Sequence, residues 1–172
     1  MVAAFLQDEL VEELKQIFKG FFLKSPSGGR DTLHIFSQLL PMPLPENQEE
    51  IPPEVLENGL IEEQTTPDPY PYIIVQINNG EIVDVNSAQI VELTLLIGIY
   101  DSDYQKQGYK DILTIIAKIY ERFGKQPILN GKYTIQYPIF WTLQDEESYP
   151  YYFGGMRLFF EIAAVRREDK FT

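Results

Sequence analysis

A long apolar segment in the middle of the chain constrains the fold more than any other feature. Residues 90–100 read Ile-Val-Glu-Leu-Thr-Leu-Leu-Ile-Gly-Ile-Tyr, a composition rich in β-branched and aliphatic side chains that is typical of a strand. Its C-terminal end is too apolar for a strand with one face in water. We therefore expect a central strand that is covered on both sides and that ends at the turn-forming residues Asp101, Ser102 and Asp103.

The segment that follows predicts a helix that packs against this strand. Gly108 leads into residues 112–123, in which apolar side chains recur at three- and four-residue intervals and so share one helical face. Gly124 and Pro127 mark the end of the helix. The residues on the predicted buried face are Ile112, Ile116, Ile119, Tyr120 and Phe123, widened by Leu113 and Ile115.

The remaining patterns predict one further helix and several strands. An amphipathic pattern covers residues 4–23, and apolar strand-like segments occupy residues 33–40, 71–77, 82–87, 132–137, 139–143 and 152–165. The sequence Asn78-Asn79-Gly80-Glu81 predicts a turn centred on Asn-Gly. Together these elements predict a single α+β domain over residues 1–172, with a mainly antiparallel sheet and two principal helices packed on one face.

The composition changes between about residues 44 and 69. Prolines interrupt any regular element here, and no Lys or Arg opposes the acidic side chains. We interpret this segment as a long, exposed acidic loop. The acidic residues that define it are Glu46, Glu49, Glu50, Glu54, Glu57, Glu62 and Glu63.

The chain as a whole is strongly acidic. Its 26 Asp and Glu outweigh 14 Lys and Arg, which gives a formal net charge of -12. Phosphates repel such a chain, so we expect no specific nucleic-acid binding and no docking on an anionic membrane. The absence of cysteine excludes disulfides, thiol catalysis and thiolate metal sites. No signal-peptide pattern and no apolar run of membrane-spanning length is present, so we expect a soluble protein made in the cytosol.

A search for catalytic patterns identifies no catalytic residue, metal ligand or cofactor site. His34, the only histidine, lies in an apolar strand-like segment, and we interpret it as a structural or surface residue. Asp101 and Asp103 resemble the start of a calcium loop, but Lys106 stands where that loop requires glycine. An enzyme that uses Asp101, Asp103 or Asp145 with a divalent cation remains the alternative from a different functional class.

The aromatic residues before the last strand are more informative. Residues 149–156 read Tyr-Pro-Tyr-Tyr-Phe-Gly-Gly-Met. One interpretation is a packed entry into the strand, and the other is a subunit interface, where Tyr, Phe and Met are enriched. The candidate interface residues are Tyr149, Tyr151, Tyr152, Phe153 and Met156.

Three segments together resemble a known family. They are Pro-Tyr-Ile-Ile-Val at residues 71–75, Thr-Leu-Leu-Ile-Gly-Ile-Tyr-Asp at 94–101 before Gly-Tyr-Lys-Asp-Ile at 108–112, and the aromatic segment 149–156. In this order they resemble the small tail-terminator and tail-completion proteins of long-tailed bacteriophages and prophages. The N-terminal helix followed by Leu39, Leu40 and Pro41 is also similar. The resemblance covers most of the chain and is weakest in the acidic loop.

The resemblance implies a structural subunit of the virion tail. Members of this family form rings, usually hexameric, that cap the head-proximal end of the tail tube, end its growth and provide the surface on which the head docks. Partners would then be further copies of the chain, the major tail tube protein and a head-tail connector protein. The family has no catalytic residues. The alternative within the same class is another neck or connector protein.

Overall fold

The computed structural model describes residues 2–41 and 68–165. Along the chain the elements are α1 (Val2–Ile17), β1 (Phe22–Lys24), β2 (Arg30–Thr32), β3 (His34–Ser37), β4 (Tyr72–Ile82), β5 (Gln89–Tyr100), α2 (Tyr109–Lys125), β6 (Ile128–Leu129), β7 (Tyr133–Leu143) and β8 (Tyr151–Ile162).

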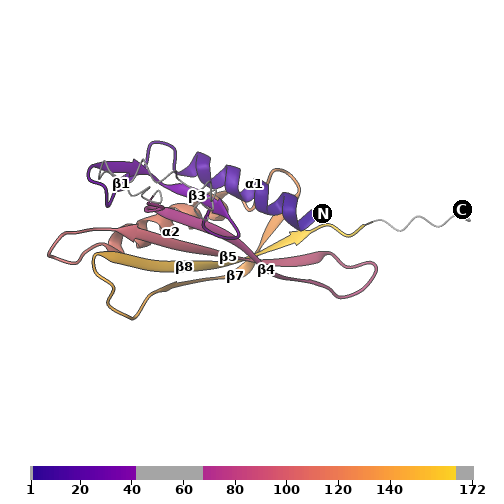
Figure 1. Ribbon diagram of the computed structural model, residues 1–172. Coiled ribbons are helices and arrows are strands. Elements are labelled where there is room, and N and C mark those ends of the chain that lie inside the picture. The colour runs from indigo at the N-terminus through magenta and orange to yellow at the C-terminus, as the bar shows by residue number, and fades with distance from the viewer. Residues whose placement is uncertain (1, 42–67, 166–172) are drawn as a thin grey trace, which may run out of the picture.

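The described strands form one large sheet and a small two-stranded ribbon. The sheet has six strands in the order β3-β4-β5-β8-β7-β6, and the ribbon pairs β1 with β2. Only β3 and β4 pair in parallel, so the sheet is mainly antiparallel. Both helices lie on the same face (Figure 1), with α1 against β3 and β4 and α2 against β5, β7 and β8. This is the predicted α+β architecture.

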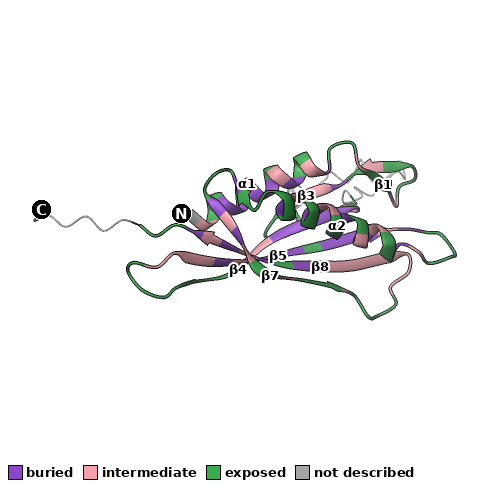
Figure 2. Cartoon of the chain, turned by 180° about the vertical axis from the view of Figure 1, so that it is seen from behind, coloured by how far each residue is buried: buried purple, intermediate pink, exposed green. Residues whose placement is uncertain are grey.

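The core lies between the helices and the sheet. Along β5 the side chains of Leu93, Leu95 and Ile97 alternate inward and are at most 1% exposed, and the same alternation buries Leu158 and Phe160 of β8. Figure 2 shows the buried residues concentrated between the two layers. The predicted central strand and the predicted direction of the β8 side chains are both confirmed.

Helix α2 follows its predicted pattern closely. Its buried residues are Ile112, Ile115, Ile116, Ile119 and Phe123. Tyr120, predicted on this face, is 52% exposed because it lies at the margin of the apolar stripe. The helix continues one residue beyond Gly124 and ends at Lys125.

The first helix is shorter than predicted. It ends at Ile17 and not near residue 23, because Gly20 adopts a left-handed backbone with φ of 77° and turns the chain. Phe22–Lys24 then pairs with Arg30–Thr32, so residues 25–29 form the tip of a small ribbon. Only this pairing partner distinguishes the end of an amphipathic helix from a short strand.

The predicted turn at residues 78–81 is wrong. Strand β4 passes through Asn79 and Gly80 and stays paired with β5 as far as Ile82, with a bulge between Ile77 and Asn79. The chain reverses later, where Asp84 accepts hydrogen bonds from the backbone of Asn86 and Ser87. The two strands predicted at 132–137 and 139–143 are likewise one strand, β7, with an irregularity between Gln136 and Phe140.

Candidate functional site: the open face of the sheet

The face of the six-stranded sheet that points away from the helices, here called the open face, has no element packed on it among the described residues (Figure 2). Side chains on this face come from alternate positions of β4, β5, β8 and β7. Several are large and apolar: Leu96 is 36% exposed and Phe140 is 43% exposed. A two-layer protein with apolar side chains on its outer sheet face carries a surface suited to a partner.

Five aromatic side chains gather at the end of the open face where β5 ends and β8 begins. The ring of Tyr70 lies at the centre, with its centroid 5.1 Å from that of Tyr72 and 4.7 Å from that of Tyr151. Phe153 lies edge-on to Tyr70 at 6.1 Å, and Tyr100 lies 5.5 Å from Tyr151. These are favourable aromatic separations. We call these five residues the aromatic cluster.

A glycine in the central strand makes this cluster possible. The ring of Tyr72 lies directly across Gly98 of the neighbouring strand, and a Cβ built at position 98 would stand 2.4 Å from the ring carbon Cζ. Tyr72 is therefore only 7% exposed although it lies on the open face. Tyr72 covers β5 at Gly98, but Leu96 of the same strand is 36% exposed on the open face. The predicted coverage of this end of β5 on both sides therefore holds at Gly98 and fails at Leu96.

An arginine lies farther along the open face. The guanidinium of Arg157 lies 4.5 Å from the ring centroid of Phe140 and 6.0 Å from that of Phe159, a cation-π arrangement. Its Nη1 is 3.8 Å from a carboxylate oxygen of Glu92. Between Arg157 and the aromatic cluster lies a shallow hollow of about 630 Å³, bordered by Thr94, Leu96 and Gly155. The open face thus combines aromatic, aliphatic and cationic surface, which is the composition of protein interfaces.

The predicted interface residues do not form one surface, because strand alternation separates them. Tyr151 and Phe153 lie on the open face within the aromatic cluster. Met156 points the other way and is only 2% exposed. Its assignment to an exposed interface was wrong, since its position in β8 places it against α2.

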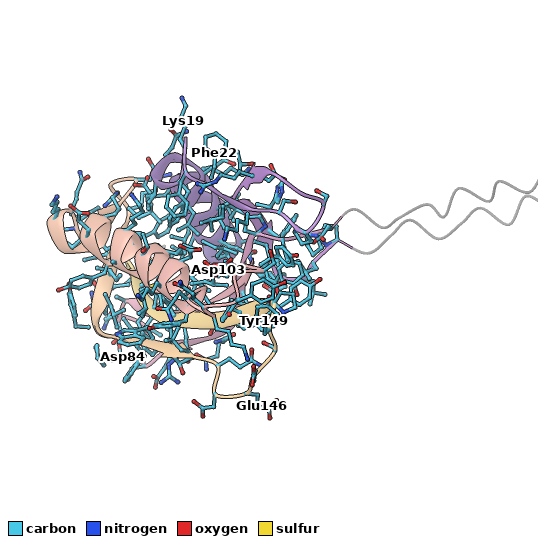
Figure 3. All side chains as sticks on the ribbon, turned by 90° about the vertical axis from the view of Figure 1, so that its left-hand side faces the viewer. Lys19, Phe22, Asp84, Asp103, Glu146 and Tyr149 are labelled. Atoms are coloured by element: carbon cyan, nitrogen blue, oxygen red, sulfur yellow. The ribbon has the colours of Figure 1, made fainter. Side chains whose placement is uncertain are left out.

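The other two predicted interface residues contact the β5–α2 loop. Tyr149 donates a hydrogen bond of 2.7 Å to the carbonyl oxygen of Ser102, and the ammonium of Lys106 lies over its ring. Figure 3, which looks onto this end of the molecule, shows Tyr149 close to the segment that carries Asp103, whereas Glu146 points outward. The Tyr152 side chain packs against Gly108, and its hydroxyl is buried without a hydrogen-bond partner in the described part of the chain.

Asp101, one of the three aspartates considered as catalytic candidates, is held in an ion pair. Asp101 is 7% exposed and accepts a hydrogen bond of 2.7 Å from the Lys24 ammonium, which raises the pKa of that amine. It also accepts one from the backbone N–H of Asp103. This ion pair joins the β1–β2 ribbon to the end of β5. Burial, together with the charge of Asp101, raises the pKa of the nearby Asp111 carboxyl.

The remaining polar candidates are dispersed. His34 Nε2 lies 2.9 Å from Asp31 Oδ2, and this hydrogen bond lowers the pKa of the aspartate. Asp145 is exposed in the β7–β8 turn, where Glu147 pairs with Lys106. Within residues 2–41 and 68–165, no three acidic or histidine side chains come close enough together to hold a metal ion. The same ranges contain no helix with the length and hydropathy needed to cross a membrane.

The predicted acidic loop lies outside the described residues. Its acidic members Glu46, Glu49, Glu50, Glu54, Glu57, Glu62 and Glu63 all fall between residues 42 and 67. The predicted placement of this loop on the surface therefore stays a prediction.

Sequence reasoning missed most of the open face. Tyr70, Tyr72 and Tyr100 are far apart in the chain and join Tyr151 only through the register of β4, β5 and β8. One signal was available: Tyr72 lies near the start of the predicted strand 71–77 and Tyr100 at the end of the predicted strand 90–100. Antiparallel pairing of these two strands would bring the two tyrosines close together. Without the pairing register, however, this signal does not specify a cluster.

No protein-family model matches the chain, and a search of curated proteins finds no match to its sequence.

Proposed function

We propose that this protein is a structural subunit of the tail of a long-tailed bacteriophage or prophage. In this role it caps the head-proximal end of the tail tube, ends tube growth and provides the docking surface for the head. It acts as a ring, hexameric when assembled, and its partners are further copies of itself, the major tail tube protein and a head-tail connector protein. It is made and assembled in the cytoplasm of the host bacterium. The proposal includes no enzymatic activity, cofactor or specific nucleic-acid binding.

The observation that carries the proposal is the open face with its aromatic cluster. A subunit that stops assembly must bind its neighbours firmly, and aromatic side chains supply large contact areas at low entropic cost. Tyr151 and Phe153 of this face belong to the segment that resembles the tail-terminator family. The resemblance and the composition of the face therefore point to the same residues.

The charge of the chain also supports this role. Double-stranded DNA must pass through the ring without binding to it, and a subunit with a net charge of -12 repels phosphates.

The test is deletion of the gene in the parent phage or prophage, followed by electron microscopy of the lysate. Loss of a terminator leaves elongated tails without heads beside filled heads without tails. Complementation with the wild-type gene restores normal particles, whereas Tyr151→Ala is expected to restore fewer. Tails of normal length that still join heads would refute the proposal. Tails of normal length that fail to join heads would identify a connector protein instead.

A further inference from the structure

The six-stranded sheet has two outer edges that lack a neighbouring strand in the described part of the chain. Strand β3 forms one edge, because its single neighbour in the sheet is β4. Strand β7 forms most of the other edge, since β6 pairs only with Tyr133 and Thr134. The backbone N–H and C=O groups along a free edge are a template for pairing with a further strand.

The two free edges lack the features that usually protect an edge strand. Proteins block such edges with lysine, proline or a bulge. In β7 the protected part is the irregularity between Gln136 and Phe140, which contains Pro138. Residues 140–143, which follow it, read Phe-Trp-Thr-Leu, and β3 reads His-Ile-Phe-Ser. Both segments contain neither lysine nor proline, so both remain suited to pairing.

The two free segments lie level with each other across the sheet. The registers of the four intervening strand pairs match each residue of 35–37 with one residue of 141–143. The matched residues are Phe36 with Thr142, Ile35 with Leu143 and Ser37 with Trp141. For Phe36 the connection passes through Ile74, Leu96 and Gly155. A second copy beside the first can therefore set its β3 against β7 with little sliding along the strands.

The directions of the two strands suit this contact. Strand β3 is parallel to β4, and each later step across the sheet to β5, β8 and β7 is antiparallel. Strands β3 and β7 of one chain therefore run in opposite directions. Two copies placed side by side in the same orientation bring β7 of one and β3 of the other together as an antiparallel pair.

The outward backbone groups of the two edges also match. The N–H of Gln38 donates to β4, and the N–H of Gln144 donates to β8. Backbone groups of successive residues point to opposite sides of a strand, so those of the odd-numbered neighbours point outward. These outward residues are Ile35 and Ser37 of β3 and Trp141 and Leu143 of β7. In the level register they oppose one another as hydrogen-bonded pairs.

The side chains match by face as well. Ile35 and Leu143 both pack against the core on the helix side, and the next residues, Phe36 and Thr142, alternate to the open face. A strand added beside β7 would cover Trp141, which is 57% exposed. It would also border the hollow of about 720 Å³ that Ile139 and Trp141 line beneath α2. The joined sheet would keep all helices on one side.

We propose that β3 of one copy pairs with the free part of β7 of the next copy, antiparallel and with Phe36 opposite Thr142. This inference rests on the proposed ring and names the contact that builds it. Because the two edges are unlike, the contact is head-to-tail and gives a ring where the rotation between copies closes. The aromatic cluster takes no part in the contact, which leaves the open face available to other partners.

Disulfide cross-linking tests the contact, because the chain contains no native cysteine. Phe36→Cys and Thr142→Cys are made in separate full-length chains, mixed at the highest soluble concentration and oxidised by air with copper phenanthroline. Residues 36 and 142 would form a non-hydrogen-bonded pair, in which the Cβ atoms approach to about 4.5 Å, close to the separation in a disulfide of about 3.5–4.5 Å.

Thr134→Cys is the matched control. Thr134 lies in the same strand and on the same face as Thr142, but β6 pairs with it. A specific contact raises the local concentration of the two thiols, so Phe36→Cys with Thr142→Cys is expected to give about tenfold more disulfide-linked dimer than Phe36→Cys with Thr134→Cys. A yield no higher than that of the control mixture would overturn the inference.

Two further arms test the head-to-tail geometry. A chain that carries both Phe36→Cys and Thr142→Cys is expected to give linked products of increasing size, because each copy then offers one thiol at each edge. Thr142→Cys alone is expected to give no more dimer than Thr134→Cys alone. An excess of Thr142→Cys dimer would show that β7 pairs with β7 of the second copy, and this would also overturn the inference.

This test is independent of the proposed function. A cross-link between residues 36 and 142 in a protein whose deletion leaves tails unchanged would preserve the contact and remove the terminator role. Elongated tails after deletion, without the cross-link, would preserve the terminator role and show that a different surface builds the ring.

Discussion

Replacing Gly154 with alanine tests how closely helix α2 approaches the sheet. Strand β8 pairs with β5 through Gly154 and Gly155 without a break in register. A Cβ at position 154 would stand 2.6 Å from Cγ2 of Ile112 and 3.0 Å from the carbonyl oxygen of Thr142. Carbon atoms normally pack at about 3.5–4.0 Å, so the helix or the strand must move.

The cost follows from the rigidity of both neighbours. Ile112 is 0% exposed and held in the core, and the Thr142 carbonyl is backbone. Overpacking of this kind costs about 1–3 kcal/mol. For a chain of this size, about 2 kcal/mol corresponds to a fall in melting temperature of roughly 4–8 °C.

Gly124→Ala provides a matched control, for which the expected change in melting temperature has the opposite sign. Gly124 lies inside α2, where the nearest atom to an added Cβ is 3.9 Å away. Alanine favours a helix over glycine by up to about 1 kcal/mol, so this variant is expected to melt higher than the wild type. Both melting temperatures are measured by circular dichroism at one protein concentration. If Gly154→Ala melted at or above the wild-type temperature, the close packing of α2 on β8 would be refuted.

Three further predictions concern the faces of the sheet and its buried charges. Leu95→Asp is expected to prevent folding, because Leu95 is 0% exposed. Leu96→Asp is expected to change the urea midpoint little, because Leu96 is 36% exposed on the open face. Equal losses of stability in the two variants would contradict the assignment of the two side chains to opposite faces. Lys24→Met leaves the carboxylate of Asp101 buried without this ion-pair partner, at a cost of about 2 kcal/mol; this is below the usual value of about 3–5 kcal/mol for a buried pair, since Lys24 is 42% exposed. Because the pKa of Lys24 is raised above its ordinary 10.5, the deficit measured by urea unfolding is present at neutral pH and disappears as the pH rises through that raised value. Asp111→Asn is expected to raise the melting temperature at neutral pH, because burial raises the pKa of Asp111 and its ionised form opposes folding. Thermal melts at decreasing pH should show the gain vanish as the pH falls below 3.8, where the carboxyl becomes protonated in both the folded and the unfolded chain.

Patterns that repeat within one element could be read from the sequence alone. The apolar positions of α2 recur every three or four residues, and those of β8 every second residue, so their buried faces were predictable without knowing what they pack against. The apolar end of β5 indicated a central strand for the same reason. These features depend on which side chains of a single element are buried. Burial of one face of a helix or strand requires apolar residues at periodic positions, and that period is visible in the sequence.

Features that depend on a partner segment were decided only by the tertiary structure. Asn79 and Gly80 favour a turn locally, but pairing with β5 as far as Ile82 keeps them in a strand. Residues 22–24 continue an amphipathic helical pattern, yet pairing with β2 makes them a strand. In both places the hydrogen bonds and contacts of the paired strand outweigh a weak local preference.

The candidate site depends on the structure for the same physical reason. The aromatic residues 149–156 are adjacent in the sequence, but the alternation of β8 sends Tyr151 to the open face and Met156 into the core. Tyr70 joins Tyr151 because β4, β5 and β8 align in one register. The sequence determines which residues are aromatic and which face of each element is apolar. Only long-range strand pairing determines which of these side chains meet, since a shift of one residue in register would turn each of them to the opposite face.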